Sequence, residues 1–152
     1  MYRGAFKVTL DSKGRVAIPT RFRDRLDARC EGQLVVTVDQ DQCLLIYPLP
    51  DWEETQRKLD RLPSFNKRAR QTQRLMVGYA TDVELDGQGR VLLSKALVEF
   101  AGLEKHAMLI GQSNKFELWD EERWTRVRDA WSTISDSGDD DEAPPAFDTL
   151  TL

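Results

Sequence analysis

The chain contains the segment Leu10-Asp11-Ser12-Lys13-Gly14-Arg15-Val16-Ala17-Ile18-Pro19, and a variant of it returns 75 positions later as Leu85-Asp86-Gly87-Gln88-Gly89-Arg90-Val91-Leu92-Leu93-Ser94. Two more blocks recur in the same order, residues 34–37 with 108–111 and residues 44–47 with 116–119. Each block of the second pair is followed five positions on by a tryptophan, Trp52 or Trp124. Three matched blocks in one order predict an internal duplication.

Each copy is predicted to start with two short strands around a tight turn and to continue into a helix. The strands are expected at residues 6–10 and 15–18, and again at 79–85 and 90–93. Gly14 and Gly89 suit the turns because a tight reversal needs a positive φ. Pro19 can occupy the first turn of the first helix, while Ser94 can cap the second and Gly102 can end it.

A second strand pair and a closing helix complete each copy. These strands are expected at residues 33–38 with 43–47 and at 107–110 with 115–119, joined by polar turns. Asp51 is predicted to cap the first closing helix, with Glu54 in the capping-box position and Pro63 at its end. Asp120 is predicted to cap the second. We expect the four tryptophans to pack in the core rather than to stack on bases: Trp52, Trp119, Trp124 and Trp131.

Residues 66–77, between the copies, predict a strongly basic helix. It carries four basic residues and no acid: Lys67, Arg68, Arg70 and Arg74. Such a helix could contact nucleic acid. The sequence favours the other interpretation, a solvated or interface helix that pairs with acidic residues of a neighbour.

The domain organisation follows from the repeat. We expect a first repeat at residues 5–52, linking helices at 53–78, a second repeat at 79–131 and an acidic, disordered tail at 135–152. A copy of this size would be marginal alone and would leave strand edges exposed. Two interleaved copies would share a core, which predicts an α+β, mainly β fold: a closed, pseudo-symmetric barrel with peripheral helices. Further edge or helix contacts would produce a homo-oligomer, with a ring favoured.

The net charge of −4 combines two unlike regions. Six of the 26 acidic residues lie in residues 135–152, which hold no Lys or Arg, whereas residues 1–29 hold eight basic residues and three acidic ones. A basic end is compatible with a surface that faces phosphate, although it can equally be a solvated face. The tail ends in three apolar residues that could dock on a neighbour or remain idle: Phe147, Leu150 and Leu152.

Other sequence features point to a cytoplasmic protein without cofactors. No stretch approaches the roughly 18 apolar residues of a membrane span, and no apolar signal segment is recognised. Cys30 and Cys43 lie in unrelated contexts, which predicts neither a disulfide nor a metal site. His106, the single histidine, approaches a strand and is expected to be structural.

The turns of both copies carry the pattern Asp-x-x-x-Arg, as Asp11 with Arg15 and Asp86 with Arg90. A carboxylate at the start of a turn can accept backbone N–H groups and pair with the arginine across the hairpin. A guanidinium fork also suits a phosphate or the edge of guanine. One arginine could have both roles if its aspartate orients it while its guanidinium reaches outward to DNA.

These motifs, with the blocks at residues 44–52 and 116–119, closely resemble the MraZ family over residues 1–131. The resemblance implies a swapped-hairpin barrel of the AbrB/SpoVT-like kind. It also implies a transcription regulator that binds repeated DNA sites upstream of the division and cell-wall operon, including its own gene, usually as a repressor. A ring-shaped, nucleoid-associated homo-oligomer with two such motifs in each chain is implied as well. Ser94, where the first copy has Pro19, departs from the family's usual Pro-ended hairpin.

The two copies differ in their charged neighbours along the chain, and this suggests different roles. Because phosphate contacts dominate affinity for DNA, the more basic first copy is expected to face it. The predicted DNA-binding residues are Arg15 and Lys13 at the turn, with Arg3 and Lys7 on the DNA backbone. The residues expected to hold the turns and the barrel are Asp11, Gly14, Asp86, Gly89 and Arg90.

The alternatives are an enzyme and a protein-binding module. The chain has no P-loop and no nucleophile elbow, and Gly87-x-Gly89 alone is too little for a dinucleotide site. Acid–base catalysis by Asp11 and Asp86 would need a raised pKa, which the neighbouring arginines oppose. An antitoxin-like module of similar fold, whose acidic tail blocks a basic target, is the stronger rival.

Overall fold

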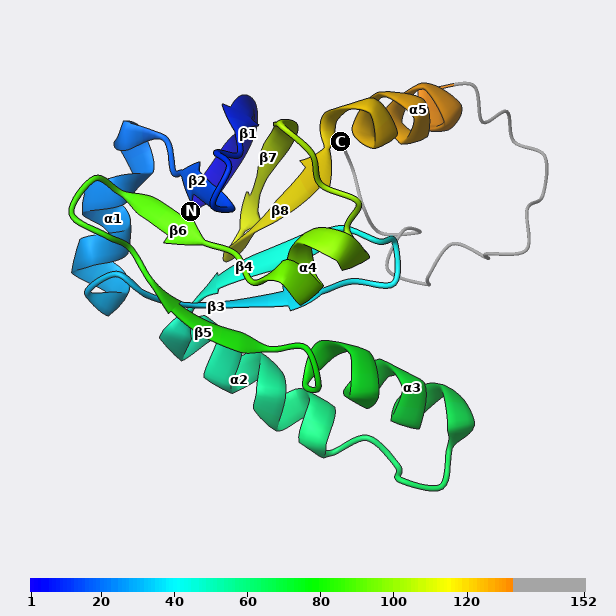
Figure 1. Cartoon of the computed structure of the whole chain (residues 1–152). Helices are drawn as coiled ribbons and strands as arrows, with labels where there is room; N and C mark the ends of the chain where they lie inside the picture. The colour runs from blue at the N-terminus through cyan, green and yellow to red at the C-terminus, as the bar shows by residue number, and fades with distance from the viewer. Residues whose placement is uncertain (133–152) are drawn as a thin grey trace, which may run out of the picture.

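The computed structural model describes residues 1–132, so the predictions for the acidic tail and for Phe147, Leu150 and Leu152 lie outside the described residues. Figure 1 shows the path of the chain. Its elements are β1 (Tyr2–Thr9), β2 (Arg15–Ala17), α1 (Thr20–Cys30), β3 (Gln33–Val38), β4 (Leu44–Pro48), α2 (Leu49–Asp60), α3 (Lys67–Met76), β5 (Thr81–Glu84), β6 (Arg90–Leu92), α4 (Lys95–Phe100), β7 (His106–Ser113), β8 (Lys115–Asp120) and α5 (Glu121–Ser132).

The two copies interleave their strands. One antiparallel sheet has six strands in the order β1-β7-β8-β4-β3-β5, and β2 pairs with β6 in a second sheet of two strands. Strand β1 of the first copy pairs with β7 of the second, and β5 of the second pairs with β3 of the first. Neither copy therefore has a sheet of its own. The chain is an α+β protein, mainly sheet, in which both halves complete one structure.

The expectation of a closed barrel is not met, because the six-stranded sheet is open with β1 and β5 at its edges. The hairpin of the first copy is held by a single bridge, between Leu10 and Val16. Strand β2 then leaves β1 and pairs with β6, with Val16 opposite Val91. We call this β2–β6 pair the ribbon. It crosses one face of the sheet as a separate two-stranded layer.

The ribbon covers the larger of two hydrophobic cores, together with α1 and α4. Val16 and Val91 point inward from the ribbon and are at most 1% exposed. Phe22 of α1 lies at the centre, with ring centroids 5.4 Å from Phe6 and 5.1 Å from Phe116. Since Phe116 belongs to the second copy, this core stabilises both copies together.

The opposite face of the sheet packs against α2, α3 and α5. Trp52 and Trp119 are buried there, as predicted. The prediction is wrong in part for Trp131, which is 50% exposed near the end of α5. Its ring packs edge-on against Trp124, with centroids 5.8 Å apart, and so covers the core only from outside.

Helix starts agree with the capping residues in two of three cases. Ser94 accepts a hydrogen bond from the backbone of α4, and Asp120 accepts one from the backbone of α5. The predicted cap at Asp51 is wrong. Helix α2 begins at Leu49, with a proline in its first turn, so Asp51 lies inside the helix and is buried. It accepts hydrogen bonds from Arg29 Nε at 3.2 Å and Nη2 at 3.1 Å.

Candidate nucleic-acid interface

The turn between β1 and β2 is organised by Asp11. Its Oδ1 accepts the backbone N–H groups of Lys13 and Arg15, each at 2.9 Å. Its Oδ2 accepts the Nε–H of Arg15 at 2.6 Å. Gly14 completes the reversal at φ 85°, in the left-handed region that glycine adopts without steric cost. These are the contacts that the structural interpretation of this aspartate predicts.

The turn between β5 and β6 repeats these contacts. Asp86 accepts the backbone N–H groups of Gln88 and Arg90 at 2.9 Å, and the Nε–H of Arg90 at 2.8 Å. Gly89 has φ 71°. Both copies thus contain the same arrangement, in which a carboxylate holds both a turn and an arginine.

The hydrogen bonds to Asp11 lower its pKa to about 2 from a usual 3.8, with the backbone N–H of Arg15 as the largest cause. The pKa of Asp86 is lowered for the corresponding reason, by the backbone N–H of Arg90. Both carboxylates are solvent-exposed and are held ionised by donors rather than by burial. Each therefore stays negatively charged at neutral pH and orients its arginine.

These pKa shifts predict an acid-sensitive turn. A carboxyl whose pKa is lowered on folding stabilises the fold above its unfolded pKa, and the contribution disappears as pH falls toward its folded pKa. We expect Asp11→Asn to destabilise the protein at pH 6, and the difference from wild type to vanish between about pH 4 and pH 2. Urea denaturation at a series of pH values measures this. A constant difference down to pH 2 would contradict the assignment.

The arginines of both turns lie on the outer face of the ribbon. Arg15 is paired with Leu92 and Arg90 with Ala17 across the two strands, whereas Val16 and Val91 point into the core. Arg15 and Arg90 are thus diagonal neighbours on one surface, and the Cα atoms of such neighbours are roughly 7–8 Å apart. Sequence reasoning assigned them to different roles and did not place them together.

The two guanidinium groups have the same set of contacts. Nε of each donates to its aspartate, and none of the described residues accepts a hydrogen bond from Nη1 or Nη2 of Arg15 or Arg90. The side chains are 29% and 30% exposed, respectively. By contrast, Arg29 uses both Nε and Nη2 on Asp51, as expected for a purely structural pair. The ribbon therefore presents two oriented forks with free donors.

Interleaving also exchanges the charged neighbours of the two turns. Lys13 of the first turn borders a hollow of about 530 Å³ together with Asp82 and Glu84 of β5. At the second turn, a Cβ on Gly89 would lie only 2.2 Å from Nε of Arg23, a residue of α1. The charged neighbours of each turn therefore cannot be found by counting charges along the chain. Two acids of the second copy line a hollow together with Lys13 of the first turn, and an arginine of the first copy lies at the second turn.

The structure does not bring Arg3 and Lys7 onto the ribbon. Both are exposed on edge strand β1, where Lys7 lies opposite Met108 and so shares the face that packs toward α5. Arg3 is eight positions before Asp11, about 26 Å away along an extended strand. A duplex on the ribbon would have to pass the β1 edge to meet them.

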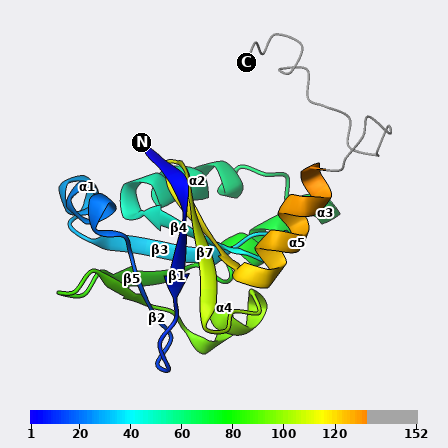
Figure 2. The same cartoon turned by 90° about the horizontal axis from the view of Figure 1, so that it is seen from above.

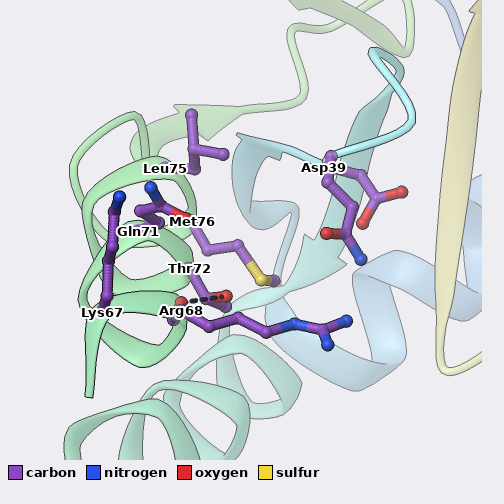
Figure 3. Close-up of a pocket in the computed structure, with 8 residues that line it drawn as sticks. Asp39, Lys67, Arg68, Gln71, Thr72, Leu75 and Met76 are labelled. Carbon is purple, nitrogen blue, oxygen red and sulfur yellow. Dashed lines mark hydrogen bonds between the residues drawn. The ribbon is translucent and has the colours of Figure 1, made fainter.

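The basic helix forms where predicted, as α3, with Asn66 as its N-cap. Figure 3 shows Arg68 extending from α3 toward the side on which Asp39 lies, while Lys67 points away. A hollow of about 650 Å³ lies between α3 and the β3–β4 turn. It lies on the other side of the sheet from the ribbon, so it is not part of the surface formed by the two turns.

Other chemistry finds no support within residues 1–132. No group of three or more His, Cys, Asp or Glu side chains in this part is arranged to hold a metal ion. Cys30 and Cys43 are free thiols, and burial raises the pKa of Cys43, which disfavours its thiolate. None of the described helices is long and apolar enough to cross a membrane. His106 is exposed at the start of β7.

The fold and the site together define a tandem-repeat protein whose copies exchange strands and each present an aspartate-oriented arginine. A family model described as "MraZ protein, putative antitoxin-like" matches residues 1–75 and again residues 76–143. Because these matches cover nearly the whole chain, the chain belongs to the MraZ family.

Individual relatives agree with this assignment. The chain is 54% identical over 131 residues to a protein of Thioalkalivibrio sulfidiphilus named "Transcriptional regulator MraZ", covering 86% of this chain and 87% of the relative. It is 48% identical over 153 residues to the protein of that name from Alkalilimnicola ehrlichii, covering all of both chains. With the one from Pseudomonas putida strain F1 it shares 56% identity over 128 residues, which cover 84% and 85% of the two chains.

Proposed function

We propose that this protein is a sequence-specific DNA-binding transcription regulator that contacts DNA through the outer face of the ribbon. The names of its relatives support regulation of transcription. The observation that supports the site is the pair of arginines, each held through Nε, while neither Nη group donates to an acceptor within residues 1–132. Such a fork matches the two acceptors of a guanine edge or of a phosphate.

Within this surface we assign the reading of DNA to Arg15 with Lys13, at the first turn. Arg3 and Lys7 contact the DNA backbone beyond the β1 edge. Asp11 and Asp86 with Gly14 and Gly89 hold the two turns, and Arg90 stabilises the second one. Contacts to the DNA backbone fix the position of the protein on the duplex, whereas contacts to bases read the sequence. Loss of a backbone contact should therefore weaken binding to any duplex, and loss of a base contact should reduce specificity.

A single ribbon is too small for tight binding alone. One protomer offers few base contacts, and useful affinity requires several linked protomers on spaced repeats. This supports a homo-oligomeric ring bound to repeated sites upstream of its own gene, in the division and cell-wall operon. We propose that it acts at these sites as a repressor.

A footprint on the DNA upstream of the gene for this chain, done across a salt series, tests this function. We expect protection of regularly spaced repeats, with log affinity falling by about 0.9 per phosphate contact for each unit of log salt. A scrambled duplex should bind only weakly.

The chain without residues 135–152 is the control against an antitoxin-like protein-binding role, which the description of the family favours. A regulator keeps its footprint after this deletion. The protein-binding module would instead be supported if the full chain gives no footprint and binds another protein that the shortened chain no longer binds.

A further inference from the structure

The second turn carries a side chain that belongs to the other copy. Helix α1 of the first copy lies beside the β5–β6 turn in Figure 1, and Arg23 reaches from this helix onto Gly89. Its Nε donates to the carbonyl of Ile18 at 2.8 Å. The N–H of Ile18 in turn donates to the carbonyl of Gly89 at 2.9 Å. Arg23 is thus fastened to the point where the two copies join.

Gly89 leaves the room that Arg23 occupies. A Cβ at this position would lie 2.2 Å from Nε, 2.5 Å from Cδ and 2.7 Å from Cζ of Arg23. The same test at Gly14 finds only the carbonyl oxygen of Leu93, at 3.1 Å. The residue that corresponds to Arg23 in the second copy is Val98, so the first turn has no such cation.

The charge of Arg23 is less compensated than that of the turn arginines. Arg15 and Arg90 are each paired with an aspartate, whereas Nε of Arg23 is bound to a neutral carbonyl. Among residues 1–132, no acid forms an ion pair with Arg23, and no acceptor is bonded to its Nη atoms. An uncompensated, positioned guanidinium at the rim of a DNA-facing surface is suited to a phosphate, where net charge matters most.

We propose that Arg23 is a phosphate-binding residue that completes the second turn, and this rests on the proposed function. The first turn then reads bases through Arg15, and the second grips the DNA backbone through Arg23. Figure 2 shows the β1–β2 turn at the bottom of the view and the β5–β6 turn at its left, with α3 and α5 on the right. The basic residue needed at the second turn comes from α1 because the copies exchange strands.

The test measures binding of the full chain to a fluorescein-labelled duplex from upstream of its gene, and to a scrambled duplex, across a salt series. We expect Arg23→Gln to weaken binding to both duplexes by the same factor, roughly tenfold at low salt. The salt slope should fall by about one for each protomer bound. Arg23→Lys, which keeps the charge, should recover the slope. The charge-matched control is Arg57→Gln on α2, an exposed residue on the other side of the sheet, and it should change neither quantity.

A second test separates the charge of Arg23 from its position. Gly89→Ala puts a methyl group into the space that Arg23 occupies, so it should lower the salt slope by as much as Arg23→Gln does, and the double variant should lower it no further. An unchanged slope in Arg23→Gln, equal losses in the Gln and Lys variants, or additive losses of slope in the double variant would overturn the inference alone. A wild-type protein that binds neither duplex would overturn the proposed function and this inference with it.

Discussion

Replacing Arg15 with alanine is expected to abolish operator binding and to leave folding and assembly intact. A bidentate contact to a base is worth about 1–3 kcal/mol, or about 5- to 150-fold, and the loss multiplies over the protomers that bind together. The fold survives because the backbone N–H groups of residues 13 and 15 still bind Asp11, and the ion pair that is lost is partly solvent-exposed. Fluorescence anisotropy on the operator duplex, with sedimentation to follow the oligomer, measures both quantities.

Arg90→Ala is the matched control, because it removes the same fork from the same ribbon. We expect a much smaller loss of affinity, since Arg90 is assigned to holding the second turn. If Arg90→Ala abolishes binding equally while assembly is unchanged, the two turns share one role and the assignment of reading to the first is wrong.

Phe22→Ala is expected to cause the largest loss of stability. The side chain is 1% exposed and contacts three aromatic rings, those of Tyr2, Phe6 and Phe116. Truncating a buried phenylalanine costs about 3–5 kcal/mol, from lost burial and from the cavity that remains. Because Phe116 lies in the second copy, both copies should lose stability together in a single unfolding transition, which chemical denaturation followed by circular dichroism would show.

Trp131→Ala provides the comparison for Phe22→Ala. It removes an even larger aromatic group, but one that is 50% exposed and covers the core from outside. We expect a clearly smaller destabilisation than for Phe22→Ala. Two separate transitions in Phe22→Ala, one for each copy, would contradict a shared core.

The local features of the fold could be predicted from the sequence with good accuracy. Turns at Gly14 and Gly89 and caps at Ser94 and Asp120 depend on a few neighbouring residues, and all four form as predicted. The cap at Asp51 failed although the pattern was good. Its carboxylate is instead held by Arg29, 22 positions earlier in the chain, and a local pattern carries no information about such a partner.

The candidate site was only half predictable. The sequence identifies Asp11 with Arg15 and Asp86 with Arg90, because each pair spans one turn. It does not place Arg15 beside Arg90, and nothing in it places Arg23 at the second turn. In the structure, strand exchange carries Arg23 to Gly89 and leaves Lys13 beside acidic residues of β5.

The structure of each turn and the charged residues around it are therefore determined in different ways. The hairpin turns and the aspartate that orients each arginine are encoded within about five residues, by backbone geometry and hydrogen bonds. The neighbours of each turn depend on β2 pairing with β6, which lies 75 positions away and is selected by burial of Val16 against Val91 in a common core. Apolar burial does not depend on how far apart two residues lie in the sequence. The two turns, and the arginine that lies at the second one, therefore come together only when both copies fold around a common core.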